Sequence, residues 1–181
     1  MFTSIQLPYT QFVPDNTATT YYIAAIHSAS PWIEEFNLQD VCRGRDIRCV
    51  VGWIKPRHRM PIHVDMGDYG PTPWALDFTT DEFKHAELEI YKNLDKLNRP
   101  TGNLVAPPNN SYGIPIIKPE NAELIDSWSF TKGAVKFTPG TNWHTGYNPD
   151  PEKWMAVVSL RSFFIEDWYA IEEKLQSVSV L

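Results

Sequence analysis

The sequence predicts a mainly β fold, a sandwich or barrel with a helix or two packed outside it. Fifteen prolines are spread along the 181 residues. They leave little room for long helices, because proline breaks a helix interior. The segments between them are short runs rich in β-branched and aromatic residues, which favour strands. Many short strands with turn residues between them are typical of β-sandwiches and barrels.

In the N-terminal half, an aromatic and apolar run at 21–26 comes first. Ser30 and Pro31 then predict a short helix that extends to about Asn37, because serine caps helix starts and proline suits the first turn. The β-rich run IRCVVGWI predicts a strand. The expected elements here are strands at 47–54, near 62–65 and at 74–78, with a Gly/Pro loop at 67–73.

In the C-terminal half, residues 80–98 fit two patterns. Apolar residues recur at helical spacing, but residues 86–90 alternate between apolar and charged as a strand does, so we expect a strand at 86–92. Residues 98–119 are rich in proline and glycine and predict a long loop of the kind that is often functional. The remaining expected elements are strands at 124–130, 134–138 and 154–164, and a terminal helix at about 165–176.

The composition indicates one folded domain over 1–181. A length of 181 residues suits a single domain, and 43% hydrophobic and 13% aromatic residues are ample for a core. Cys42 and Cys49 are the only cysteines, and we expect both to be reduced. The N-terminus lacks the pattern of a signal peptide, and no stretch approaches the roughly 18 apolar residues of a membrane span. We therefore expect a cytoplasmic protein.

The net charge of −6 argues against a nucleic-acid partner, because such binding draws on clustered cations. The densest basic stretch lies at 43–59. It is either a solvated face beside a strand or a local groove for a phosphate or carboxylate.

The unit His63-Val64-Asp65 carries the first signal of chemistry. In a strand, residues two apart point the same way, so His63 and Asp65 would project together from one face. An imidazole and a carboxylate that converge are half of a metal site. His144, in the phrase WHTGYN, is a candidate for a further ligand. Arg161, in an otherwise apolar strand, shares a face with Ser159 and needs a partner if it is buried.

The order His63-x-Asp65, His144, Arg161 resembles the signature of the Fe(II)- and 2-oxoglutarate-dependent oxygenases. The flanking phrases PIHVD, WALDF and WHTGYN are similar to small oxygenases encoded by phages and bacteria, and the resemblance covers about residues 50–164. It implies a double-stranded β-helix, or jelly roll, with a core at about 47–164 and flanking segments packed outside.

The resemblance also implies a chemistry. His63, Asp65 and His144 would hold Fe(II), and two imidazoles and one carboxylate on one face leave positions open for 2-oxoglutarate and O₂. Arg161 would pair with the distal carboxylate of 2-oxoglutarate, assisted by the hydroxyl of Ser159. The expected reaction hydroxylates an unactivated C–H bond and releases succinate and CO₂. Four further residues could line the substrate pocket or support the ligands: Trp74, Asp77, Trp143 and Tyr147.

Taken singly, each of these residues has an ordinary structural interpretation, such as a hydrogen-bonded histidine or a partly buried ion pair. Two other functions stay open. One is a cupin-like metal enzyme that does not use 2-oxoglutarate, although the His-x-His unit usual in cupins is absent. The other is a non-catalytic β-sandwich that binds a partner through its aromatic residues. For an oxygenase, a small molecule and a peptide stay equally open as the substrate, with the loops at 67–73 and 98–119 as specificity elements.

Overall fold

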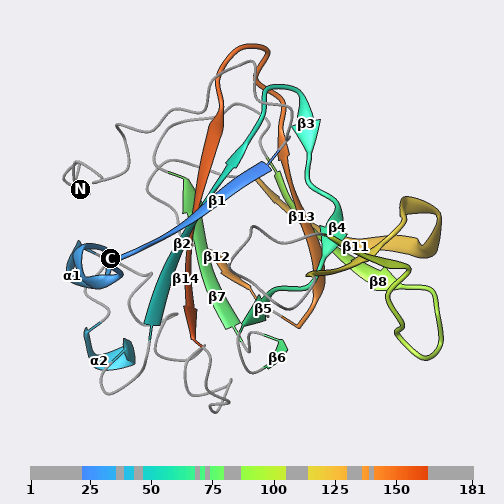
Figure 1. The fold of residues 1–181 in the computed structure, drawn as a ribbon, viewed down its shortest axis with the longest axis horizontal. Helices are drawn as coiled ribbons and strands as arrows, with labels where there is room; N and C mark the ends of the chain where they lie inside the picture. The colour runs from blue at the N-terminus through green and yellow to red at the C-terminus, as the bar shows by residue number, and fades with distance from the viewer. Residues whose placement is uncertain are drawn as a thin grey trace.

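The computed structural model describes residues 22–35, 39–42, 47–67, 70–71, 74–79, 87–104, 114–129, 136–138 and 141–162. These residues form two antiparallel sheets and a few short helices (Figure 1). No helix among them is long and apolar enough to cross a membrane.

The first sheet has five strands in the order β1-β2-β14-β7-β12. Their bounds are Tyr22–His27 for β1, Ile47–Ile54 for β2, Met155–Ser162 for β14, Trp74–Thr79 for β7 and Lys136–Thr138 for β12. Two short helices, α1 (Ser30–Glu35) and α2 (Gln39–Cys42), lie beside this sheet (Figure 1). The amide of Ser30 donates to the hydroxyl of Ser28 at the start of α1.

The second sheet follows the order β11-β8-β13-β4-β10-β9, with β3 paired to β13. The bounds are Ala122–Ser129 for β11, Glu87–Asn93 for β8, Trp143–Asn148 for β13, Ile62–His63 for β4, Ile114–Ile117 for β10, Gly102–Leu104 for β9 and His58–Arg59 for β3. A separate pair joins β5 (Met66–Gly67) to β6 (Gly70–Pro71), and one 3₁₀ turn, η1, covers Pro119–Asn121.

Eight of these strands pair in a nested pattern. In chain order they are β2, β4, β7, β8, β11, β12, β13 and β14. The first pairs with the last, the second with the seventh, the third with the sixth and the fourth with the fifth. Two sheets joined in this way form a jelly roll. The predicted mainly β, jelly-roll fold is confirmed.

Apolar side chains pack on both sides of the first sheet. On its outer side the ring of Trp32, from α1, meets the edge of Phe78 with centroids 4.8 Å apart. Between the sheets, Ile54, Leu88 and Met155 form a buried cluster. These residues come from both sheets, so the cluster packs the sheets against each other.

A second cluster covers the outer side of the second sheet. It consists of Ile62, Val64, Ile117 and Trp143. Because side chains alternate along a strand, Ile62 and Val64 face outward while His63 faces the space between the sheets. The hydrophobic residues on either side of His63 therefore anchor this part of the chain from behind.

Several predicted elements need correction. The strand near 62–65 ends at His63, so Asp65 follows the strand and is not part of it. The predicted loop at 98–119 contains strands β9 and β10, and the Gly/Pro loop at 67–73 contributes to the β5–β6 pair. Strand β13 was not predicted. The strand expected at 86–92 is confirmed as β8. The terminal helix at 165–176 lies outside the described residues.

Candidate metal centre

The two histidines of the predicted site lie opposite each other on neighbouring strands. His63 of β4 and His144 of β13 are direct Cα partners in the antiparallel ladder. Residues paired in this way project from the same face of the sheet. Their ring centroids are 4.5 Å apart, and the ring planes are tilted by 50°.

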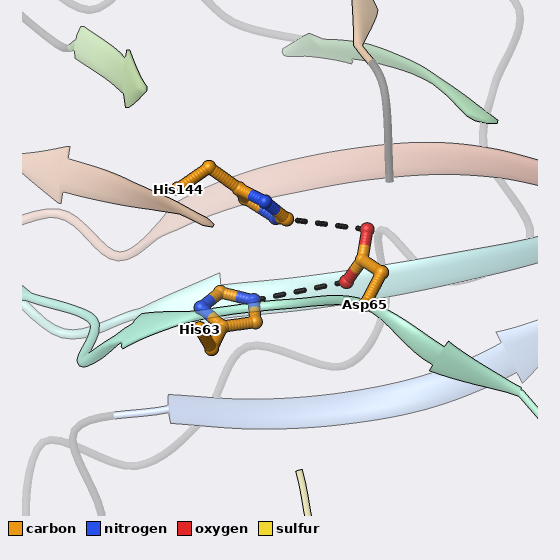
Figure 2. A group of neighbouring side chains, drawn as sticks. All are labelled: His63, Asp65 and His144. Carbon is orange, nitrogen blue, oxygen red and sulfur yellow. Dashed lines mark ion pairs between the residues drawn. The ribbon is translucent and has the colours of Figure 1, made fainter. Parts of the chain in front are cut away.

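Asp65 completes a group of three side chains. Its Oδ1 lies 3.7 Å from Nε2 of His63, and its Oδ2 lies 3.6 Å from Nε2 of His144 (Figure 2). One ligand atom from each residue falls within 4.8 Å of the others, a separation that a single ion can bridge. The three side chains are buried, with exposed fractions of 6%, 3% and 7% for His63, Asp65 and His144.

Backbone carbonyls orient both imidazoles. Nδ1 of His63 lies 2.8 Å from the carbonyl oxygen of Pro61, and Nδ1 of His144 lies 2.8 Å from that of Asn142. A carbonyl only accepts, so each Nδ1 carries the proton and donates it. Each Nε2 then points toward the space between the three side chains, where a metal ion would lie. This is the usual arrangement of metal-binding histidines. Two imidazoles and one carboxylate with this orientation fit a divalent transition metal.

The electrostatics of the site also suit a cation. Burial, together with the neighbouring His144, lowers the pKa of His63 from 6.5 to about 4, so the imidazole stays neutral. Burial would raise the pKa of Asp65, but Arg161 and the two imidazoles outweigh it and lower that pKa. Neutral imidazoles and an ionised carboxylate are the forms that bind metal.

Arg161 contacts the same carboxylate. Its Nη2 lies 2.9 Å from Oδ1 of Asp65, and its Nε donates to the hydroxyl of Ser159 at 2.9 Å. The side chain is 16% exposed. The predicted placement of Arg161 and Ser159 on one inward face is therefore correct. Asp65 supplies the partner that a buried arginine needs, so the pairing of Arg161 with the distal carboxylate of 2-oxoglutarate stays a prediction.

Asp77 lies on the neighbouring strand, opposite Ser159 in the ladder. It is buried, with 5% of the residue exposed. Burial, and then the charge of Asp65, raise its pKa, although a hydrogen bond with Ser159 opposes the rise. A polar chain therefore runs from Asp77 through Ser159 and Arg161 to Asp65.

These groups border a cavity between the sheets. The space not filled by atoms amounts to about 460 Å³, including its opening to solvent. Its polar lining comes from His63, His144, Asp77, Ser159 and Arg161. Its apolar lining comes from Val50, Gly52, Ile54, Met60, Leu88, Gly146 and Val157. A cavity of this kind, apolar with a few convergent polar groups, is typical of small-molecule sites.

Two of the other predicted pocket residues face away from the cavity. Trp143 belongs to the outer cluster, and its indole nitrogen donates to Asn98 at 2.6 Å. The ring of Tyr147 lies under the guanidinium of Arg59, 4.8 Å from its carbon. Because Trp143 and Tyr147 alternate with His144 along β13, both face away from the cavity. Trp74 lies in β7, but its side chain is outside the described residues.

One inward residue was missed by sequence reasoning. Thr138 of β12 pairs with Ala75 of β7 and is 1% exposed, and its hydroxyl has no hydrogen-bond partner among the described residues. The only signal in the sequence was its place in the β-like run at 134–138. Cys49 is a free, buried thiol, as expected, and burial raises its pKa to about 12.

Comparisons with known proteins find only distant structural likenesses. No family model matches the chain, and no curated protein matches it. An oxalate oxidase in complex with the substrate analogue glycolate is 13% identical, with 86% of this chain and 58% of that chain covered and a TM-score of 0.46. E. coli ycfD is 14% identical, with 90% and 38% covered and a TM-score of 0.47.

A third structure, the polyketide cyclase RemF from Streptomyces resistomycificus, is 8% identical, with 90% of this chain and 88% of that chain covered and a TM-score of 0.37. The chain thus spans 58% of the oxalate oxidase and 38% of ycfD. With every TM-score of these three below 0.5, the assignment of the jelly roll rests on the order of the strands, and that of the site on its geometry.

Proposed function

We propose that the protein is an Fe(II)- and 2-oxoglutarate-dependent dioxygenase that hydroxylates a C–H bond of a small molecule or peptide. One observation carries the proposal. Two imidazoles and a carboxylate converge at one end of a jelly-roll cavity, and an arginine on the facing sheet lines the same cavity.

In this proposal His63, Asp65 and His144 hold the metal. The bound metal would supply activation of O₂, coupled to oxidative decarboxylation of 2-oxoglutarate to succinate and CO₂. The backbone carbonyls of Pro61 and Asn142 hold the imidazoles in their binding orientation, so the site is ordered before the metal enters.

Arg161 and Ser159 would hold the distal carboxylate of 2-oxoglutarate. A guanidinium has five N–H donors in a rigid fork and can serve two carboxylates from adjacent edges. Arg161 lies beside the ligand group, so a cosubstrate bound to the metal can reach it. The apolar lining around Ile54, Leu88 and Val157 would exclude water and contact the carbon atoms of the cosubstrate and the substrate.

A metal-dependent jelly-roll enzyme that does not use 2-oxoglutarate is the second candidate. The contact between Arg161 and Asp65 favours it, because an arginine that already pairs with a protein carboxylate has less need of a ligand carboxylate. A non-catalytic binding module would have no use for three convergent ligand side chains. A single domain over 1–181, a cytoplasmic location and the lack of a nucleic-acid partner stay predictions from the sequence.

The test is succinate formation. The protein is incubated with Fe(II), 2-oxoglutarate and O₂ in the presence of metabolite and peptide pools, and succinate is measured. We expect succinate from the wild type and none from His144→Ala. Metal binding without succinate in any pool would favour the second candidate.

A further inference from the structure

The contact between Arg161 and Asp65 has a consequence for the metal. Nη2 of Arg161 lies 2.9 Å from Oδ1, while Nε2 of His63 lies 3.7 Å from the same oxygen. The guanidinium therefore already neutralises the one carboxylate of the proposed ligand group. Both partners are largely withdrawn from water, with 3% of the Asp65 side chain and 16% of the Arg161 side chain exposed.

A divalent metal at this site would be a second cation on the same carboxylate. Charges that are buried together are poorly screened, so the guanidinium and the metal repel each other strongly. They also compete for the lone pairs of Oδ1. The metal gains less from Asp65 than it would from a carboxylate without a cationic partner.

The anchor of the guanidinium lies on strands β14 and β7 of the first sheet, in the wall of the cavity. Nε of Arg161 donates to Ser159, whose strand partner is Asp77, and all three line the cavity. A carboxylate that enters the cavity next to Ser159 would meet the guanidinium there. It would share or replace Asp65 as its partner and so leave Asp65 to the metal.

We infer that Arg161 is a positioning residue that holds down metal affinity until a carboxylate ligand engages it, so that metal and carboxylate ligand bind cooperatively. The inference rests on the proposed metal site, but it does not require the hydroxylation reaction. By linkage, each ligand strengthens the other by the same factor.

A second arginine–carboxylate pair provides a matched control. Arg59 pairs with Glu89, which also accepts from the hydroxyl of Tyr91 at 2.5 Å. Glu89 is buried, with 7% of its side chain exposed, and it alternates along β8 with Leu88, which lines the cavity. The pair thus lies on the outer face of the sheet, and its loss should not reach the metal.

The experiment is a titration with Co(II) alone, followed by absorbance, for the wild type and for Arg161→Gln, Arg161→Lys and Arg59→Gln. We expect Arg161→Gln to bind Co(II) about tenfold more tightly than the wild type, within the range of typical couplings. Arg161→Lys keeps the charge and should stay near the wild type. Arg59→Gln should match the wild type.

A repeat of the titration with saturating succinate tests whether a carboxylate ligand strengthens metal binding. Succinate supplies two carboxylates without the 2-oxo group that chelates a metal. It should tighten Co(II) binding to the wild type by at least about fivefold, and it should leave Arg161→Gln unchanged. Equal or weaker Co(II) binding by folded Arg161→Gln, or no effect of succinate on the wild type, overturns the inference.

Circular dichroism of each variant shows whether it folds without metal. If Arg161→Gln does not fold without metal, the succinate titration of the wild type alone tests the inferred cooperativity. Failure of the proposed function looks different: the wild type would not bind Co(II), or His144→Ala would bind it equally well.

Discussion

His63 and His144 face each other as direct partners across strands β4 and β13, with their ring centroids 4.5 Å apart. The jelly roll makes them neighbours by pairing its second strand with its seventh. Each ring is held by the carbonyl of the residue two positions before it, so the same local geometry is built twice. Asp65 then needs only to follow β4 to reach both Nε2 atoms (Figure 2).

Replacing any one of these three residues by alanine should abolish tight metal binding. Two remaining ligands hold the ion poorly. The loss should exceed the roughly 10–100-fold that follows removal of an outer hydrogen-bond partner. Metal analysis after anaerobic loading with Fe(II) and desalting measures it. His58→Ala, an exposed histidine outside the group, is the control. Undiminished iron in all three variants would rule the group out.

Arg161→Ala should weaken 2-oxoglutarate binding to the metal-loaded protein by about 2–5 kcal/mol, the range for truncating one partner of a buried charge pair. Arg161→Lys should recover only part of this, because an ammonium cannot make a planar two-point contact. Calorimetric titration at saturating Mn(II) separates this effect from that on metal affinity. Unchanged affinity in Arg161→Ala would remove the residue from the cosubstrate site.

The contribution of His63 to the stability of the metal-free protein should fall as the pH drops from about 6.5 to about 4. Native His63 takes up its proton only at a pKa of about 4, whereas the unfolded residue does so near 6.5. The unfolded state thus binds more protons in this pH range. The resulting loss in the free energy of unfolding is at most about 3 kcal/mol. Asp65, whose pKa is lowered from 3.8, adds a loss only at more acidic pH.

Urea unfolding at pH 7 and pH 4.5 measures the difference. His63→Gln should flatten the pH dependence in this window, because glutamine does not titrate. An equally steep dependence in that variant would mean that another group is responsible.

Gly146→Ala should destabilise the protein by about 1–3 kcal/mol, the cost of overpacking a core. An added Cβ at Gly146 would lie 2.8 Å from Cδ1 of the fully buried Ile54. Gly102→Ala is the matched control, because its Cβ would lie 3.5 Å from Cγ1 of Ile116, an ordinary contact. Thermal unfolding of both variants checks the prediction, and equal melting temperatures would contradict it.

The sequence predicted the strands whose apolar pattern is local. Residues 47–54 and 74–78 carry dense β-branched and aromatic residues, and both form strands of the first sheet. Strand β13 was missed because glycine and asparagine in WHTGYN disfavour strands. Long-range contacts hold it instead. The hydroxyl of Thr145 donates to the backbone carbonyl of Met60 at 2.6 Å. The side-chain amide of Asn148 donates to the backbone carbonyl of Ile54 at 2.8 Å.

The candidate site was predicted in part for a similar reason. The order of these residues resembles the signature of a known family, and that resemblance named His63, Asp65 and His144 together as candidate ligands. The partner of Arg161 could not be predicted, because the contact with Asp65 joins the two sheets and depends on their packing. Trp143 and Tyr147 were expected near the pocket because the sequence does not show which alternate residues of β13 face the cavity. His144 faces it, so Trp143 and Tyr147 face away.

In the proposed function, this site binds Fe(II) and 2-oxoglutarate together. The most direct measurement is the visible absorption spectrum of the anaerobic protein loaded with Fe(II), before and after 2-oxoglutarate is added. We predict a weak charge-transfer band that appears only when both are present and that His63→Ala, Asp65→Ala and His144→Ala lack. Stoichiometric Fe(II) binding with no such band at saturating 2-oxoglutarate would contradict the claim.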